Sequence, residues 1–347
     1  MSKNIKFCMV GFGNVGVRFA ELLLEKETQL QEEYGCRVQL TGICTRSKGA
    51  LINHNGMDIG EILEMNKKLN RFDPQSTDFV ACDTSEMIAR SGADLMIELS
   101  TISIEDGQPA TGYIEQALTA GMHVITANKG PEAWHFRKLA ELATKMNRHF
   151  LYETIVMDGT PIFNLAKETL HGNKILGIKG ILNSTTNFIL EKMEKGMSYE
   201  EAVKEAQRIQ VAEADPSMDV DGWDGTAKIC SLANILMDAG VNPKMAKVTS
   251  MGNITPEEIR RALESNRKIK YLCIAERNEV TRQVDIIVEP RLLAFDDPLS
   301  NVNGTSSAIT FYTDLAGEIS IIQTDPEILQ TAYGVYSDLI TLIKSLG

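Results

Sequence analysis

The stretch AEADPSMDVDGWDGTAK, residues 212–228, concentrates six acidic or basic side chains directly before an apolar run, ICSLANILMDAG. Asp224 and Lys228 lie four positions apart, so on a helix they share one face. The neighbouring carboxylate favours the charged ammonium, which makes Lys228 a candidate proton donor near neutral pH. Glu213, on the preceding loop, is a candidate to bind a substrate ammonium group. The segment therefore indicates an active site.

Two other interpretations compete for this segment. A calcium-binding loop would explain the alternating oxygens of SMDVDG, but with Gly222 at position 6 the twelfth position is Lys228, where a bidentate glutamate belongs. The second interpretation is that the segment is the solvent-exposed first turn of a helix, because acidic residues are favoured at the N-terminal end of a helix dipole. The lysine excludes the calcium loop, and the helix start stays as the alternative.

The sequence VGFGNVG near the N-terminus places Gly11, Gly13 and Gly16 in the spacing G-x-G-x-x-G. The first glycine permits a tight turn, the second lets the main chain approach a pyrophosphate, and the third lets the helix pack on the strand. The N-terminus of that helix then faces the phosphates. Glycine turns without ligands are common, but this one follows a strand-like run and opens a helix-like one, which predicts dinucleotide binding.

The end of the second expected strand bears on the choice of dinucleotide. NAD sites usually carry a carboxylate there, which bonds the ribose 2′-hydroxyl. This chain has Thr45, Arg46, Ser47 and Lys48 instead, so two cations and no carboxylate stand at the position. Solvated loop charges are the competing explanation. The pattern favours the 2′-phosphate of NADP and leaves NAD open.

Two further expected strands end in ELST and TANKG, which puts Thr101 and Lys129 just beyond their carboxyl ends. In an open parallel sheet, ligands gather at that edge. An ordinary surface lysine is the competing explanation. At this edge, however, Lys129 is expected to contact cofactor or substrate.

Strand-sized apolar runs alternate with helical patterns through the first part of the chain, which predicts βαβ units and a parallel sheet. After about residue 156, longer and partly alternating runs such as KIKYLCIAE and VDIIVEPRLL indicate a sheet with one covered face. We expect a Rossmann-type α/β domain over 1–155 and a mixed α/β catalytic and dimerisation domain over 156–317. A C-terminal helix over about 318–347 could pack back on the first domain.

The composition limits the kind of protein. The 347 residues are 43% hydrophobic and 24% charged, which fits a globular chain with a sizeable core. A formal net charge of −12 argues against nucleic-acid binding, and no apolar run approaches the roughly 20 residues of a membrane span. Six scattered cysteines without a C-x-x-C pair favour reduced, buried thiols. A cytoplasmic protein without nucleic-acid or membrane partners is expected.

The charged segment resembles the signature of the homoserine dehydrogenase family, in which a glutamate and Asp-Pro precede G-x-D-x-x-x-K. VGFGNVG, TANKG, YETIVMDGTPI and GILNSTTNFIL resemble that family's other blocks, in the same order across nearly the whole chain. The resemblance implies NAD(P)-dependent interconversion of L-homoserine and L-aspartate 4-semialdehyde, in threonine and methionine biosynthesis, by a homodimer. A related dehydrogenase of another small amino or hydroxy acid is the alternative, and an idle nucleotide sensor is disfavoured because both lysines are present.

The resemblance also implies roles for individual residues. Lys228 would protonate the alkoxide formed by hydride transfer, and Lys129 would assist between nicotinamide and substrate. Glu213 and Asp224 would bind the amino-acid and hydroxyl ends of homoserine, and Asp224 also belongs to the expected catalytic group. The residues expected at the cofactor are Gly11, Phe12, Gly13, Asn14, Val15, Gly16, Arg46, Thr101, Lys129 and Gly304.

The resemblance further implies a structural sodium ion, held largely by main-chain oxygens around Glu153, Val156 and Asp158. The chain departs from the family pattern in three places. Gln210 stands where the signature has glycine, Asp158 stands where an aliphatic residue or alanine is usual, and IIQTDPEILQTAYG replaces a glycine-rich block. These departures leave room for a divergent substrate. No C-terminal regulatory domain is expected beyond Gly347.

Overall fold

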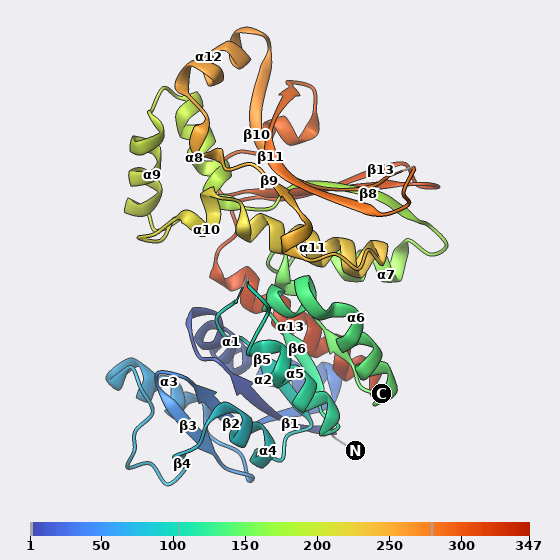
Figure 1. Ribbon diagram of the computed structural model, residues 1–347. Coiled ribbons are helices and arrows are strands. Elements are labelled where there is room, and N and C mark those ends of the chain that lie inside the picture. Colours follow the sequence, from blue (N-terminus) through green and yellow to red (C-terminus); the bar gives the residue numbers. More distant parts are fainter. Residues whose placement is uncertain (1–2, 104, 279) are drawn as a thin grey trace. The chain divides into compact units, whose positions relative to one another are not determined.

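The computed structural model describes residues 3–103, 105–278 and 280–347. The chain folds into two compact units, coloured along the sequence in Figure 1. The first comprises Met1–Pro131, His135–Phe163 and Glu327–Gly347, and the second comprises Glu132–Trp134 and Asn164–Pro326. The first unit thus extends to Phe163, beyond the boundary expected at residue 155. Residues 318–326 belong to the second unit and not to the C-terminal helix.

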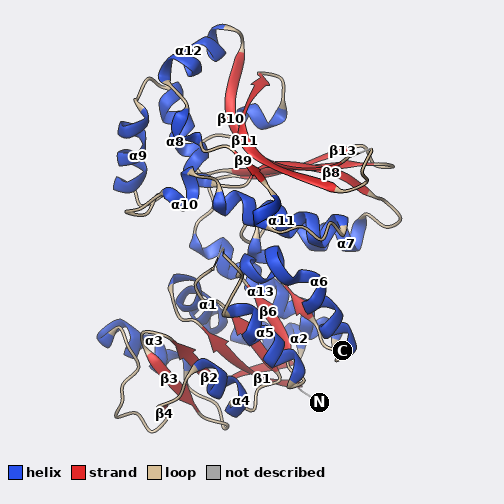
Figure 2. Cartoon of the chain, viewed as in Figure 1, coloured by secondary structure: helices blue, strands red, loops and turns tan. Residues whose placement is uncertain are grey.

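The first unit is built around a seven-stranded sheet with the order β4-β3-β2-β1-β5-β6-β7 (Figure 2). Its strands are β1 (Lys3–Val10), β2 (Cys36–Thr45), β3 (Gly49–Ile52), β4 (Phe79–Val80), β5 (Leu95–Glu98), β6 (His123–Thr126) and β7 (Phe150–Leu151). All neighbours are parallel except β3, which runs antiparallel to both β2 and β4. The predicted Rossmann-type α/β fold is confirmed, with an antiparallel extension that the sequence did not reveal.

Helices cover both faces of this sheet. They are α1 (Asn14–Glu25), α2 (Glu27–Tyr34), α3 (Ile59–Leu69), α4 (Thr84–Arg90), α5 (Ala110–Thr119), α6 (Lys129–Lys145), the 3₁₀ turn η1 (Glu153–Ile155) and α13 (Ile328–Ser345). Phe7 and Met9 of β1 join a core with α1, α3 and α13, whereas Cys8 and Val10 join a core with α4, α5 and α6. Burial on both faces explains the nearly continuous apolar run of β1.

The C-terminal helix α13 approaches the main chain of the first unit closely. A Cβ atom on Gly334 would lie 2.6 Å from Thr154 Cβ and 2.8 Å from the carbonyl oxygen of Asp158. One turn further, the buried carboxylate of Asp338 accepts a hydrogen bond from the Glu153 amide at 2.8 Å. Burial raises the pKa of Asp338 well above its ordinary value. The helix is thereby anchored on the segment that follows β7.

The second unit contains a six-stranded sheet with the order β13-β12-β8-β10-β11-β9. Its strands are β8 (Ile175–Ile181), β9 (Lys247–Val248), β10 (Arg267–Arg277), β11 (Val284–Ala294), β12 (Ser307–Thr313) and β13 (Glu318–Gln323). Neighbours are antiparallel except β9 and β11, which are parallel. The predicted mixed α/β architecture is confirmed.

Helices of the second unit lie on this sheet and at its end. They are α7 (Ile162–Thr169), which starts in the first unit, α8 (Ser184–Glu194), α9 (Tyr199–Arg208), α10 (Ser217–Val220), α11 (Trp223–Met237) and α12 (Pro256–Glu264), with 3₁₀ turns η2 (Pro243–Met245), η3 (Met251–Asn253) and η4 (Pro298–Asn301). α11 packs on β8, β10 and β11, and α8 packs on α9 and α12. Within the described ranges, no helix has the length and apolarity needed to cross a membrane.

Replacing Gly334 by alanine tests the close packing of α13. The added methyl group would overlap Thr154 and the Asp158 carbonyl, so we expect a loss of about 1–3 kcal/mol in the free energy of unfolding. Gly112 in α5 is the matched control, because its Cβ would meet only a side-chain oxygen of Gln108 at 3.4 Å. Gly112→Ala should be neutral or stabilising by up to about 1 kcal/mol. Equal stabilities of the two variants in urea would contradict the packing argument.

Candidate active site

The glycine turn between β1 and α1 has the geometry of a pyrophosphate cradle. Gly11 has φ +97°, and a Cβ atom there would lie 2.4 Å from the carbonyl oxygen of Leu99. A Cβ on Gly16 would lie 3.2 Å from the carbonyl oxygen of Gly11, so strand and helix meet closely. At Gly13, by contrast, no described heavy atom lies within 4 Å of the Cβ position. The three glycines therefore fit the turn, the open approach and the close packing that a dinucleotide requires.

The other residues of this turn differ in what they can offer a cofactor. Asn14 is exposed and Val15 is partly exposed at the start of α1. The ring of Phe12 is only 2% exposed and packs near Phe72, with a centroid separation of 6.1 Å. Of Phe12, only main-chain atoms can face a ligand at this edge.

The two cations after β2 lie in different surroundings. Arg46 is exposed, whereas Lys48 is partly buried. The Lys48 ammonium donates to the carbonyl oxygen of Phe12 at 2.8 Å and to Asn66 Oδ1 at 2.7 Å. Burial lowers the pKa of Lys48. Lys48 thus braces the glycine turn, and Arg46 is the cation placed to meet a ligand in solvent.

Thr101 and Lys129 follow β5 and β6, which run parallel to β1, so both lie beyond the carboxyl edge of the sheet. Thr101 is exposed, and Lys129 is the partly buried first residue of α6. Asn128 caps that helix by accepting a hydrogen bond from the Gly130 amide at 3.0 Å.

A buried carboxylate at the same edge was missed by the sequence analysis. Glu98, the last residue of β5, is 0% exposed. It accepts hydrogen bonds from the Ser100 amide at 2.9 Å and from the Thr126 hydroxyl at 3.1 Å. Burial raises the pKa of Glu98 to about 6, and the hydrogen bonds oppose that rise. In the sequence Glu98 looks like any acidic residue at a strand end.

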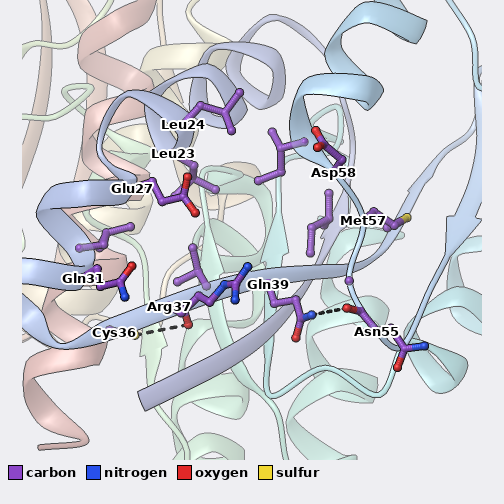
Figure 3. A pocket seen from close by; sticks show the side chains of 15 residues that line it. Leu23, Leu24, Glu27, Gln31, Cys36, Arg37, Gln39, Asn55, Met57 and Asp58 are labelled. Atoms are coloured by element: carbon purple, nitrogen blue, oxygen red, sulfur yellow. Dashed lines mark hydrogen bonds between the residues drawn. The ribbon is translucent and has the colours of Figure 1, made fainter. Parts of the chain in front are cut away.

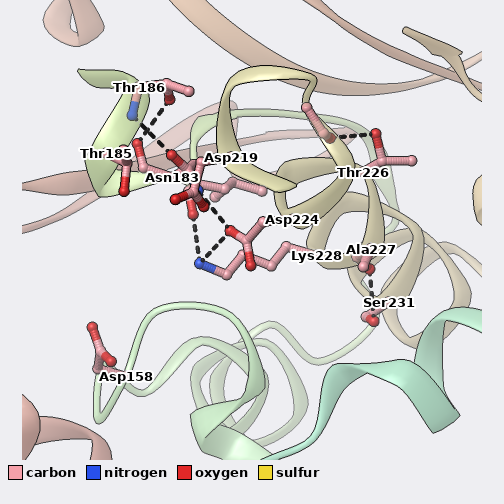
Figure 4. A network of polar contacts seen from close by, with 12 residues as sticks. Asp158, Asn183, Thr185, Thr186, Asp219, Asp224, Thr226, Ala227, Lys228 and Ser231 are labelled. Carbon is pink, nitrogen blue, oxygen red and sulfur yellow. Dashed lines mark hydrogen bonds and ion pairs between the residues drawn. The ribbon is translucent and has the colours of Figure 1, made fainter. Parts of the chain in front are cut away.

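In the second unit, the charged segment folds into α10, a turn and the first part of α11. Lys228 Nζ lies 3.2 Å from Asp224 Oδ2, in the i, i+4 relation that the spacing predicts. It also donates to the carbonyl oxygen of Leu182 at 2.7 Å. Asn183 Nδ2 donates to Asp224 Oδ2 at 3.0 Å and to Asp219 Oδ1 at 2.7 Å (Figure 4). An ammonium, two carboxylates and an amide therefore meet where β8 passes into α8.

Asp219 and Asn183 are further residues that the sequence analysis did not single out. Burial raises the pKa of Asp219, and the nearby charge of Asp224 adds to the rise. Asn183 also caps α8 by accepting from the Thr186 amide at 2.9 Å. The available signal was the place of Asp219 inside the charged segment and the strand-to-helix transition in GILNSTTNF.

Glycine at position 222 is required where α11 begins. Gly222 has φ +84°, and a Cβ atom there would lie 2.3 Å from the hydroxyl oxygen of Tyr271. The turn therefore passes directly over β10 before Asp224 enters the helix.

Glu213 lies in the loop between α9 and α10. Its main-chain oxygen accepts a hydrogen bond from Gln207 Nε2 at 3.3 Å, and the residue is exposed. Gly304, expected at the cofactor, lies in the loop before β12, where it lines a cavity of about 440 Å³ together with Glu191 and Asp325. Its amide donates to Glu191 Oε2, and its carbonyl accepts from Asn187 Nδ2 at 3.1 Å.

The residues expected at sodium form a tight turn after β7. Asp158 has φ +47°, and its carboxylate accepts from the Thr331 hydroxyl at 2.6 Å. Glu153 Oε1 accepts from the Phe163 amide at 2.7 Å. Val156 is 4% exposed, and no hydrogen bond between described residues reaches its carbonyl oxygen or that of Asp158. Carbonyl oxygens that accept no hydrogen bond from the described residues are suitable ligands for a small cation such as sodium.

Another cavity, of about 320 Å³, lies between α1, α2, the start of β2 and residues 55–59 (Figure 3). Its lining includes Leu23, Glu27, Arg37 and Met57. None of the predicted site residues lines it, and it adjoins the amino end of β2. Cavity size therefore does not identify the functional edge of this sheet, whereas the glycine turn does.

Two family models match the chain. The one described as "Homoserine dehydrogenase, NAD binding domain" matches residues 11–153, and the one described as "Homoserine dehydrogenase" matches residues 161–340. The NAD(+)-dependent homoserine dehydrogenase of Pseudomonas canavaninivorans is 34% identical over 340 residues, which covers 98% of this chain and 96% of the relative. The homoserine dehydrogenase of Methanocaldococcus jannaschii is 38% identical over 338 residues, which covers 97% and 98%.

Solved structures agree with these relatives. A homoserine dehydrogenase from Thiobacillus denitrificans superposes with a TM-score of 0.83 at 26% identity, covering 99% of this chain and 74% of that one. A hyperthermophilic archaeal homoserine dehydrogenase in complex with NADPH gives 0.82 at 26% identity, covering 99% and 98%. The comparisons thus do not favour the alternative of a dehydrogenase for another small acid.

Proposed function

The chain belongs to the homoserine dehydrogenase family, and we propose that Lys228, oriented by Asp224, is the proton donor in its NAD(P)-dependent interconversion of L-homoserine and L-aspartate 4-semialdehyde. The observation that carries the proposal is the ion pair in the first turns of α11, where Asp224 and the Leu182 carbonyl hold the ammonium. Two oxygen partners fix its position, and the carboxylate favours its charged form.

The residues of this chain then have separate tasks in the reaction. A bound nicotinamide supplies the hydride to the aldehyde carbon or accepts it from the alcohol. Lys228 gives a proton to the developing alkoxide, and takes it back in the oxidative direction. Lys129 adds a second positive charge that stabilises the oxygen as its negative charge develops. Glu213 binds the substrate ammonium, and Asp224 binds the hydroxyl end while it orients Lys228.

The cofactor is held at the carboxyl edge of the first sheet. The open approach at Gly13 receives the pyrophosphate, flanked by Gly11 and Gly16, and Thr101 contacts the cofactor beyond β5. Arg46 reads the 2′-phosphate of NADP, because it is the exposed cation after β2 while Lys48 is bonded to Phe12 and Asn66. Gly304 is a further proposed contact of the cofactor.

A sodium ion bound to main-chain oxygens of Glu153, Val156 and Asp158 is the second part of the proposal. The support is the buried Val156 carbonyl without a described hydrogen-bond donor and the left-handed turn at Asp158. Sodium would be coordinated by the lone pairs of these oxygens and would stiffen the segment on which α13 packs. It would take no part in the chemistry.

The third part of the proposal is that the protein is a cytoplasmic homodimer. The family resemblance implies the dimer, and the six free cysteines support the cytoplasm. The second unit exposes large apolar side chains, Leu292 at 53%, Phe295 at 42% and Ile322 at 51%. Exposed apolar side chains of this kind are candidates for a subunit interface.

Arg46→Asp tests the reading of the 2′-phosphate. We expect NADP binding to weaken by about 10- to 100-fold, since one charge-assisted hydrogen bond is lost and a repulsive charge is added, while NAD binding changes little. Arg37→Asp, an exposed arginine at the other end of β2, is the control and should leave both affinities unchanged. Fluorescence titration measures all four affinities. Equal losses for NADP and NAD would show that Arg46 does not read the phosphate.

Removal of sodium tests the cation site independently of activity. At constant ionic strength, protein in choline chloride should unfold at a lower temperature than protein in sodium chloride, because an ion that binds only the folded state stabilises it. Adding sodium back should restore the midpoint in a saturable way. A midpoint insensitive to this exchange would rule the site out.

Lys228→Ala tests the proposed acid. The expected result is a fall in kcat of about 10²–10⁴-fold, the usual contribution of a positioned general acid, with cofactor binding unchanged. Lys204, an exposed lysine of α9, provides the control variant Lys204→Ala, which should keep full turnover. Near-normal turnover in Lys228→Ala would end this mechanism, and the charged segment would then be a solvated helix start.

Glu213→Ala provides the contrast that separates binding from chemistry. Because Glu213 acts on the amino-acid end in both ground and transition state, its loss should raise KM for homoserine with kcat nearly unchanged. A fall in kcat with unchanged KM would instead place Glu213 in the proton transfer.

A further inference from the structure

Glu98 ends β5 in the last row of the parallel sheet, paired with Val10 of β1 on one side and Thr126 of β6 on the other. Its carboxylate is fully buried, and no ion pair within the described part of the chain includes it. A buried carboxylate without a cation is unfavourable unless hydrogen bonds satisfy it. The positions of those hydrogen bonds show what the carboxylate holds in place.

The hydrogen bonds run in a fixed direction from β6 to Glu98. The main-chain N–H of Asn128 can only donate, and it donates to Thr126 Oγ1 at 3.0 Å. The Thr126 hydroxyl hydrogen is therefore directed to Glu98 Oε2, 3.1 Å away. The other carboxylate oxygen, Oε1, accepts from the Ser100 amide at 2.9 Å. Both oxygens of Glu98 thus act as acceptors, a role that an ionised carboxylate fills.

Asn128 closes the ring on the far side. Its Nδ2 donates to the carbonyl oxygen of Ser100 at 3.3 Å, and its Oδ1 accepts from the Gly130 amide at 3.0 Å. The main chain is thereby fixed immediately before and after Lys129, the first residue of α6. The ring ties the ends of β5 and β6 together at the residue proposed to assist catalysis.

We propose that Glu98 is a positioning residue, which acts through Thr126 and Asn128 to set the direction in which the Lys129 side chain leaves the main chain. The inference rests on the proposed role of Lys129. A displacement of about 1 Å in a catalytic group can lower a rate by about 10²-fold. The hydrogen bonds of the ring restrain the main chain on either side of the lysine and oppose such a displacement.

Glu98→Gln tests the ring with little change in shape. If the amide oxygen keeps the Ser100 bond, the amide nitrogen faces a threonine hydroxyl that already accepts from Asn128, and the hydroxyl hydrogen loses its acceptor. We expect kcat to fall about 10- to 100-fold. KM for homoserine and the NADPH dissociation constant should stay within about threefold, since Glu213 and the glycine turn are untouched.

Threonine 126 supplies the matched variants. Thr126→Val removes the hydroxyl and should lower kcat by a similar factor, whereas Thr126→Ser restores the hydroxyl and should recover most of the activity. The double variant Glu98→Gln, Thr126→Val should fall no further than either single change, because both break the same path. If Glu98→Gln fails to fold, the valine and serine pair still gives the test. Full turnover in Thr126→Val, or losses that multiply in the double variant, would overturn the inference.

Lys129→Met separates this inference from the proposed function. If Lys129→Met lowers kcat and Glu98→Gln adds nothing in that background, the inference is supported. If Lys129→Met lowers kcat but Glu98→Gln alone does not, the positioning role is wrong while the role of Lys129 stands. If Lys129→Met keeps full turnover, both are wrong.

Discussion

The ion pair between Asp224 and Lys228 is the interaction on which the proposed catalytic site of the second unit depends. Both side chains are largely withdrawn from solvent, with 16% and 18% of their surfaces exposed, so each charge needs fixed partners. The Leu182 carbonyl supplies one for the ammonium, and Asn183 supplies one for the carboxylate. Gly222 precedes the first residue of α11, and its positive φ and its closeness to the Tyr271 hydroxyl leave no room for a side chain there.

The first unit meets a related constraint at the ends of its strands. A parallel sheet buried on both faces brings apolar strands to one edge, where the chain must turn and ligands bind. Polar groups placed there are shielded by the neighbouring loops and must bond to them. Glu98 accepts from the Ser100 amide in the loop after its own strand, and Asn128 donates to the Ser100 carbonyl of that loop. Lys48 donates to the carbonyl of Phe12. In both units, polar groups at the ends of strands and helices hold the loops that carry the proposed site residues.

Local patterns made much of this arrangement predictable. The glycine spacing of Gly11, Gly13 and Gly16 and the four-residue spacing of Asp224 and Lys228 express constraints within one turn or one helix face. The partners of these residues could not be predicted in the same way. Asn183 bonds to Asp219, which lies 36 positions later in the chain, and the sequence GILNSTTNF does not indicate which carboxylate will accept this hydrogen bond. The strand β4 likewise depends on a distant partner, since Val80 pairs with Ala50 of β3. By contrast, β3 and β13 form hairpins with β2 and β12, and the sequence analysis missed these local pairings.

The departures from the family pattern acquire a structural explanation in the main chain. Gln210 has φ +62° and follows the last turn of α9. Its amide donates to the carbonyl of Gln207 at 3.1 Å, and the Val211 amide donates to that of Ala206 at 2.9 Å, which is the bonding pattern of a Schellman cap. Glycine is the usual residue at such a position because it adopts positive φ without strain, and a residue with a Cβ costs about 1 kcal/mol there.

The glutamine at position 210 therefore affects the stability of a helix end and leaves the carboxylates of the charged segment in place. Asp158 likewise has a main chain in the left-handed region, and its carboxylate accepts a hydrogen bond from the Thr331 hydroxyl that holds the turn in place. Substitutions of this kind keep the path of the chain while they change its side chains. Neither Gln210 nor Asp158 is one of the residues proposed to bind substrate, so these two departures carry no argument for a different substrate.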